Sequence, residues 1–151
     1  MKRVLVASML LLLAACESRR ENPMLSEKEI SKLASEEENF WLQVGESKTL
    51  SPDNTQIGFQ QVVSDSRCPR EVTCVWEGRG DIRVWLKPQL GDSAFAEVFI
   101  SGTTSAADTC CHESTTALGY KITLLQLDPY PETTSQPQAS AYKALLKVAR
   151  Q

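Results

Sequence analysis

The stretch DIRVWLK, residues 81–87, places Ile82, Val84 and Leu86 at alternate positions. Successive side chains of a β-strand point to opposite faces, so this alternation predicts a strand with one buried face. Pro88 and the turn-forming LGDS sequence follow directly and end the strand. The stretch therefore indicates a half-buried strand of an antiparallel sheet.

Similar short runs recur about every ten residues from Phe40 onward. Such spacing predicts an all-β domain over residues 40–151, an antiparallel β-sandwich (immunoglobulin-like) with seven to eight strands. The second clear pattern, TQIGFQQVV, is expected to place Ile57, Phe59, Gln61 and Val63 on one face. The runs are FWLQV (40–44), KTL (48–50), TQIGFQQVV (55–63), DIRVWLK (81–87), FAEVFI (95–100) and GYKITLLQL (119–127).

The last run, AYKALLKVAR at residues 141–150, fits two periodicities. A helical stripe would use Tyr142, Leu145, Leu146 and Ala149, whereas a strand would use alternate positions from Tyr142 to Val148. The all-β context and the short length favour a strand.

The first fifteen residues have the parts of an export signal. Lys2 and Arg3 precede an apolar run, Val4 to Leu13, that is too short to span a bilayer. The sequence LAAC that ends at Cys16 resembles the lipobox of bacterial lipoprotein signal peptides. That resemblance implies cleavage before Cys16, attachment of a diacylglyceryl group to its thiol, and a chain held to the cell envelope by membrane lipid. Glu17 favours the outer over the inner membrane in a Gram-negative cell.

Residues 16–39 are charged and poor in large apolar residues, which predicts a tether between the lipid and the domain. Ser26 and Glu29 have the spacing of a capping box, so a short helix over residues 27–37 is the alternative. Without Lys2 and Arg3 the chain has 14 basic and 19 acidic residues, a net charge of −5. This charge and the scattered basic residues argue against nucleic acid as a partner.

Export to an oxidising compartment makes disulfides the first interpretation of the remaining four cysteines. Cys68 and Cys74 would close the short ring CPREVTC and leave Cys110 and Cys111 as a strained vicinal pair. Alternatively, each cysteine of the ring pairs with one of the vicinal cysteines. Trp76, two residues after Cys74, is expected on the same strand face, with its ring over the sulfur atoms.

The stretch DSRCPREVTCVWEGRGDIRVWL, residues 65–86, resembles a family of small secreted and lipoprotein domains of bacteria. The shared pattern is an Asp-Ser-Arg-Cys-Pro sequence, a second cysteine, a tryptophan and a glycine, and it continues in GYKITLLQLDPYP and YKALLKV. The resemblance covers most of residues 40–149 and supports a final strand, but this family has no assigned activity. DTCCHE, residues 108–113, is not part of the pattern. The matching positions are Asp65, Ser66, Arg67, Cys68, Pro69, Cys74, Trp76 and Gly78.

Asp65 and Arg67 lie just before Cys68 and have two interpretations. The guanidinium could bind an anionic ligand, or the pair could hold the turn by local hydrogen bonds, which we favour. Tyr130 lies in LDPYPETTSQPQAS, residues 127–140, which is either a contact surface or a stiff connection between the last two strands. Together with Trp76, these side chains are the candidate binding residues.

A second cluster, DTCCHE, contains Cys110, Cys111 and the only histidine, His112. Thiolate and imidazole are ligands of Zn²⁺ and Cu(I), but adjacent residues rarely reach one metal together. A vicinal disulfide with a redox role is the other reading of this cluster. The disulfide interpretation of the cysteines is the stronger one, so we expect neither a bound metal nor another cofactor.

The chain lacks the sequence signatures of catalysis: it has no Gly-x-Ser-x-Gly elbow, phosphate-binding glycine loop or His-x-x-x-His pair. We therefore predict a non-catalytic, lipid-anchored module that binds an unknown envelope protein or polymer, through its loops or by pairing a strand to a sheet edge. The alternatives are a hydrolase inhibitor that uses the ring around Pro69 to Thr73, and a metal or redox protein that uses Cys110, Cys111 and His112.

Overall fold

A computed structural model of the chain describes residues 37–102, 106–107, 112–135 and 137–151. The predicted signal peptide, the lipidation site Cys16 and the tether up to residue 36 lie outside these residues. The first strand begins at Glu37, inside the segment expected to be the end of the tether. No helix among the described residues is long and apolar enough to cross a membrane.

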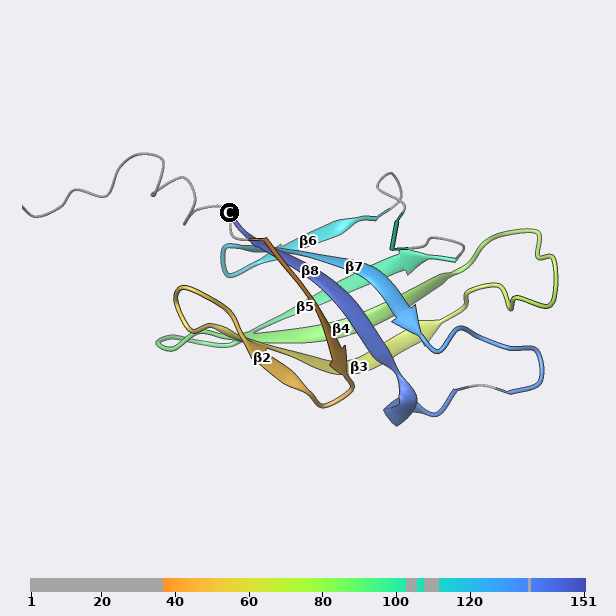
Figure 1. The fold of residues 1–151 in the computed structure, drawn as a ribbon, viewed down its shortest axis with the longest axis horizontal. Helices are drawn as coiled ribbons and strands as arrows, with labels where there is room; N and C mark the ends of the chain where they lie inside the picture. The colour runs from red at the N-terminus through yellow and green to blue at the C-terminus, as the bar shows by residue number, and fades with distance from the viewer. Residues whose placement is uncertain (1–36, 103–105, 108–111, 136) are drawn as a thin grey trace, which may run out of the picture.

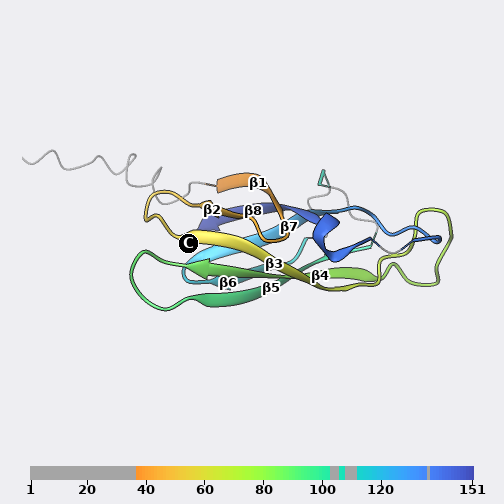
Figure 2. The same ribbon diagram turned by 90° about the horizontal axis from the view of Figure 1, so that it is seen from below.

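The protein is an antiparallel β-sandwich of eight strands, as the alternating patterns predict (Figure 1). One sheet has the strand order β1-β8-β7-β6 and the other β2-β3-β4-β5, so most neighbours in a sheet are also neighbours in sequence. Figure 2 shows the two layers edge-on. The elements are β1 (Glu37–Gln43), β2 (Ser47–Thr49), β3 (Gln56–Asp65), β4 (Arg79–Lys87), β5 (Ala94–Ser101), β6 (Ser114–Ala117), β7 (Tyr120–Asp128), the 3-10 turn η1 (Ala139–Ala141) and β8 (Lys143–Arg150).

The core forms between the sheets from alternate residues of the strands. Ile82, Val84 and Leu86 of β4 are fully buried, which confirms the pattern of the DIRVWLK stretch. The last segment is strand β8, and its buried residues are those that the strand pattern selects: Ala144, Leu146 and Val148, after Tyr142. The helical alternative for this segment is wrong, because one face of β8 packs against the opposite sheet.

The predicted alternation of β3 holds only in its first half. Ile57 and Phe59 are fully buried, but Gln61 and Val63 are exposed. The pairing with β4 shifts register after Phe59 and again after Val62, and each extra residue turns the following side chains to the other face. Val62 packs against the core instead.

The two ends of the sandwich differ. At one end, the termini end, Glu37 pairs with Ala149 and Arg150 lies 3.6 Å from Asp53. At the other, the loop end, β3, β5 and β7 finish, and the connections 66–78, 102–113 and 129–142 begin. Figures 1 and 2 show the 66–78 connection extending beyond the strands at this end. The residues of the predicted site therefore gather opposite the start of β1.

Candidate functional site at the loop end

The connection 66–78, which we call the clip loop, is closed by a disulfide between Cys68 and Cys74. The Cα atoms are 5.9 Å apart, and the backbone N–H of Cys68 donates to the carbonyl of Glu77 at 3.0 Å. The predicted pairing is confirmed, and the alternative in which each of these cysteines bonds one of the vicinal pair is excluded. By the loop-entropy argument, so small a ring contributes roughly 2 kcal/mol to the free energy of unfolding.

The base of the clip loop is closed by two glycines. Gly78 has a φ of +67°, and a Cβ atom there would lie 1.8 Å from the carbonyl oxygen of Ser66. Gly102 donates its N–H to the carbonyl of Gly78 at 3.0 Å, and a Cβ on Gly102 would lie 1.8 Å from the oxygen of Glu77. Only glycine fits such close approaches of two backbones. The end of β5 is thereby held against the foot of the clip loop.

Arg67 joins the clip loop to β7. Its side chain is 3% exposed and forms an ion pair with Asp65, with Nη2 2.7 Å from Oδ2 and Nε 2.8 Å from Oδ1. Nη1 donates to the carbonyl of Leu127 at 2.6 Å, and Nη2 donates to the carbonyl of Pro129 at 3.1 Å. The Asp65–Arg67 pair therefore makes structural contacts, as in the favoured of the two interpretations, but these contacts also reach β7 and are not confined to the turn.

Tyr142 completes this buried network from the start of β8. Its hydroxyl donates to Oδ2 of Asp65 at 3.0 Å. Burial of the ring raises the pKa of Tyr142 to about 12, and the charge of Asp65 and this hydrogen bond add to the effect. The sequence patterns selected Tyr142 only as a core residue, because a pattern carries no signal for a partner 77 positions away.

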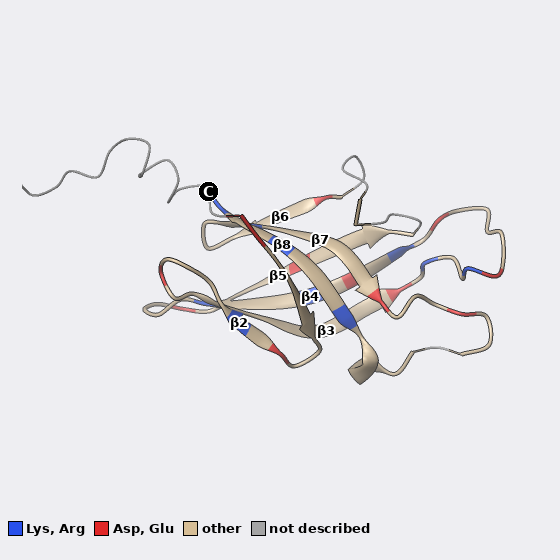
Figure 3. Ribbon diagram, in the orientation of Figure 1, with Lys and Arg blue, Asp and Glu red and all other residues tan. Residues whose placement is uncertain are grey.

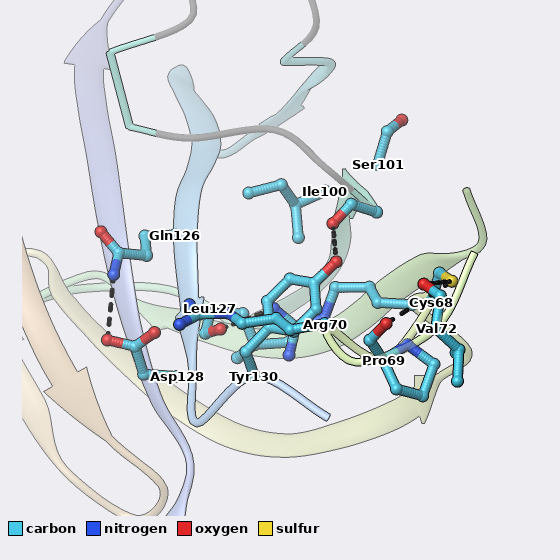
Figure 4. Close-up of a pocket in the computed structure, with 12 residues that line it drawn as sticks. Cys68, Pro69, Arg70, Val72, Ile100, Ser101, Gln126, Leu127, Asp128 and Tyr130 are labelled. Atoms are coloured by element: carbon cyan, nitrogen blue, oxygen red, sulfur yellow. Dashed lines mark hydrogen bonds between the residues drawn. The ribbon is translucent and has the colours of Figure 1, made fainter. Parts of the chain in front are cut away.

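Tyr130 lies between the three connections of the loop end (Figure 4). Its hydroxyl donates to the carbonyl of Gly102, while the guanidinium groups of Arg67 and Arg70 lie 4.7 Å and 4.8 Å from the centre of its ring. Burial raises the pKa of Tyr130, and the two arginines oppose this shift. The 129–142 connection is thus fixed to β5 and to the clip loop at once.

Trp76 does not lie where the sequence predicted it. Residues 69–78 belong to no strand, so the alternation that would place its ring on the face of Cys74 does not apply, and the side chain is 77% exposed. Its neighbour Val75 is 95% exposed, and Val72 is 48% exposed. The clip loop therefore presents an apolar tip, Val75–Trp76, to solvent. An apolar pair directly after the second cysteine is the sequence signal for this tip that our reasoning missed.

A cavity of about 420 Å³ opens beside the clip loop, between the ends of the two sheets. Figure 4 shows Ile100 from β5, Leu127 from β7 and Tyr130 around it, with Pro69, Arg70 and Val72 of the clip loop closing one side. Tyr130 and the ring that contains Pro69, Arg70 and Val72 were candidates from sequence, whereas Ile100 and Leu127 were expected only as strand residues. No pattern in the sequence indicates the cavity, because its walls come from separate parts of the chain.

The predicted metal or redox cluster is largely outside the described residues, which exclude Cys110 and Cys111. His112 is described: its Nδ1 lies 2.8 Å from the carbonyl oxygen of Leu124, on the sheet that contains β7. Among the residues that the structure describes, no three His, Cys, Asp or Glu side chains come together as metal ligands.

Charged side chains are interspersed over the described part of the fold, and Figure 3 shows no continuous stripe of basic residues along its strands.

Comparison of the chain with protein-family models, with curated proteins and with solved structures finds no match.

Proposed function

We propose that this protein is a lipid-anchored, non-catalytic binding module of the bacterial cell envelope, and that it binds a partner protein through its loop end. The observation that carries the proposal is the apolar tip Val75–Trp76, exposed on a loop that is fixed by a disulfide. An exposed tryptophan gains free energy when a partner covers it, and tryptophan is enriched among residues that dominate binding.

The rigidity of the clip loop supports this proposal. The Cys68–Cys74 ring, the close contact of Gly78 with Ser66 and the buried Arg67 restrict the loop before any partner arrives. A loop that is already ordered loses less conformational entropy on binding, so more of the contact energy appears as affinity. Asp65, Arg67 and Tyr142 hold the loop in place through their contacts with one another. These structural contacts account for the three buried polar side chains without a catalytic role.

The arrangement of the two ends fits an anchored protein. The lipobox resemblance places the lipid on Cys16, and the chain from there enters the fold at Glu37, at the termini end. The clip loop, which carries the tip, lies at the opposite end (Figure 1). A chain anchored through Cys16 would hold its termini end toward the tether and present the tip away from it.

The test is site-specific photocrosslinking in cells that make the full chain with its own signal. A benzophenone amino acid at position 76 should crosslink to a defined envelope protein, whereas the same group at position 95 should not. Phe95 is the matched control because it is also exposed, at 63%, but lies on the outer face of β5. In detergent extracts, Trp76→Ala should reduce recovery of that protein at least tenfold, and Phe95→Ala should leave it unchanged. Equal crosslinking from both positions would reject the proposal.

A hydrolase inhibitor is the second candidate, and the disulfide-closed clip loop is the observation that favours it. A rigid convex loop that inserts into an active-site cleft needs little ordering on binding. Titration of the chain against secreted proteases and lysozymes tests this candidate. Absence of inhibition at micromolar concentration removes it and leaves the binding module unaffected.

A further inference from the structure

We infer that the cavity beside the clip loop binds a carboxylate that adjoins an apolar side chain, supplied by a peptide segment of the partner. This inference rests on the proposed function, because it names the chemistry that the loop end recognises. The volume of the cavity, about 420 Å³, falls in the range of roughly 300–1,000 Å³ that is usual for ligand pockets.

The positive charge of the cavity comes from Arg70. Arg67 also lines it, but the charge of Arg67 is compensated by Asp65 and its N–H groups are directed to carbonyl oxygens. Arg70 has no ion pair within the described part of the chain, and its guanidinium lies 4.8 Å from the centre of the Tyr130 ring. A guanidinium beside an aromatic ring keeps N–H groups with which it can bind a carboxylate in a bidentate manner.

Among the described residues, no carboxylate forms an ion pair with Arg70, although the charge of Glu77 acts on the neighbouring Tyr130 and adds to the burial that raises its pKa. Asp128 is the acidic residue among those around the cavity, and its Oδ2 accepts a hydrogen bond from Nε2 of Gln126 at 3.0 Å. Figure 4 shows this hydrogen bond between Gln126 and Asp128, apart from Tyr130 and Ile100. Glu71, next to Arg70 in sequence, accepts a hydrogen bond from the backbone of Thr133 at 3.3 Å. Arg70 is therefore the cation around the cavity that no described carboxylate pairs with.

Much of the remaining lining is apolar, although Ser101, Gln126 and Asp128 also contribute to it. Ile100 and Leu127 are 2% and 1% exposed and extend into the core, and Val72 forms part of the wall on the clip loop. An apolar wall next to one guanidinium matches a carboxylate with an aliphatic group within a bond or two of it. A peptide supplies this combination at its C-terminal residue, or through a Glu or Asp beside an aliphatic residue.

The test uses residues 17–151, exported behind an ordinary cleavable signal so that the chain carries no lipid. All core residues lie between Phe40 and Val148, so this chain retains the whole core. The probes are N-acetyl-Gly-Leu with a free carboxylate and N-acetyl-Leu-Glu amide. The controls are N-acetyl-Gly-Leu amide, which has no charge, and octanoate, which is an apolar acid without a peptide. Titration by ¹⁵N NMR should give saturable shifts at Val72, Gly102 and the Arg70 side chain, with a Kd on the order of 1 mM.

Arg70→Gln should weaken binding of the acid probes about tenfold or more, because a hydrogen-bonded charge pair is lost. Lys87→Gln, at the far end of β4, is the matched control and should leave the Kd unchanged. The two acid probes distinguish a C-terminal carboxylate from a side-chain carboxylate, and binding of either supports the inference.

Three results would overturn the inference: equal shifts with the amide control, an unchanged Kd in Arg70→Gln, or shifts with octanoate but with neither acid peptide. Failure here leaves the crosslinking from position 76 intact, so it removes only the cavity inference. Conversely, carboxylate binding without any partner at position 76 would reject the proposed function alone.

Discussion

At Arg67, one side chain links two sheets of the sandwich. Its guanidinium neutralises Asp65 on the clip-loop side and donates to the carbonyls of Leu127 and Pro129 on the β7 side. Both charged groups are nearly buried, so their removal from water is compensated by each other, by these hydrogen bonds and by the one that Asp65 accepts from Tyr142. The arrangement makes the loop end sensitive to the loss of either partner.

We predict that Arg67→Met lowers the free energy of unfolding by about 3–5 kcal/mol, because it leaves the Asp65 carboxylate buried without an opposite charge. The double variant Asp65→Asn/Arg67→Met should recover part of this loss, since it removes both charges. Urea-induced unfolding measures all variants.

The control for this prediction is Arg83→Met. Arg83 pairs with Glu97 at 2.6 Å, but the two side chains are 37% and 57% exposed. A surface pair of this kind contributes less than about 1 kcal/mol. If Arg67→Met and Arg83→Met unfold at the same urea concentration, the buried network does not stabilise the loop end.

The Cys68–Cys74 pair could be predicted because a separation of six residues brings the two cysteines together whatever the rest of the fold does. Asp65 and Arg67 were singled out by the family pattern and by their position beside this ring. It placed Trp76 wrongly, because the argument extended a strand alternation into a loop. The carbonyl acceptors of Arg67 lie 60 and 62 residues away, and no local pattern records such a pairing.

At the scale of the element, the clip loop depends on how its two strands are joined. β3 reaches Asp65 and β4 begins at Arg79, so the loop has to return the chain within thirteen residues to the neighbouring position in the same sheet. The N–H of Ser66 donates to the carbonyl of Arg79 at 2.8 Å, directly before the close approach at Gly78. The foot of the loop is therefore the point that a side chain would disturb most.

We predict that Gly78→Ala destabilises the protein by roughly 2 kcal/mol more than Gly119→Ala. Both glycines have a positive φ, +67° and +76°, so alanine is strained at each by about 1–2 kcal/mol. A Cβ at Gly119 meets nothing within 4 Å, whereas at Gly78 it overlaps the oxygen of Ser66. Thermal and urea unfolding of the two variants gives the difference directly, and equal losses would show that the contact is easily relaxed.

A strand and its core residues could be predicted from the sequence wherever one face of the strand is buried along its whole length. β4 and β8 are of this kind, and their alternation selects the core residues directly. β3 departs from its pattern because two register shifts are set by its pairing with β4. A bulge depends on the neighbouring strand, so the residues of β3 alone do not reveal it.

At the scale of the whole molecule, a tyrosine and an aspartate meet near each end of the sandwich. Tyr120 donates to Oδ1 of Asp53 at 2.6 Å at the termini end, and Tyr142 donates to Asp65 at the loop end. Burial and the hydrogen bond to Asp53 raise the pKa of Tyr120 to about 12, as burial and Asp65 do for Tyr142. Burial also acts to raise the pKa of Asp53, but hydrogen bonds from Tyr120 and Thr55 outweigh it, so that pKa is lowered.

We predict that stability falls as the pH rises from 10 to 12. The unfolded chain releases the tyrosine protons near pH 10, whereas the folded chain keeps them to about pH 12. The stabilising contribution is therefore complete below pH 10 and is lost through this interval, by up to about 1.4 kcal/mol per pH unit for each tyrosine. Unfolding in urea at several pH values measures the slope.

The matched variant is Tyr120→Phe/Tyr142→Phe, which should be less stable at neutral pH but should have a shallower slope above pH 10. A slope that equals that of the unchanged chain would mean that other groups cause the alkaline loss. The sequence predicted the layers and the strand count of the molecule, but not these two pairings, because each joins residues 67 or 77 positions apart.

The placement of both ends of the domain at the termini end has a practical consequence for measurement. Glu37 and Ala149 are paired neighbours, and the backbone N–H of Gln151 donates to the carbonyl of Gly119 in the adjacent turn. A biotin acceptor peptide fused after Gln151 would therefore attach the domain to a sensor surface by its termini end, in the orientation that an anchor at Cys16 would give. The chip would then present Val75 and Trp76 to an injected extract, and the orientation of the immobilised protein would reproduce the one proposed for the cell.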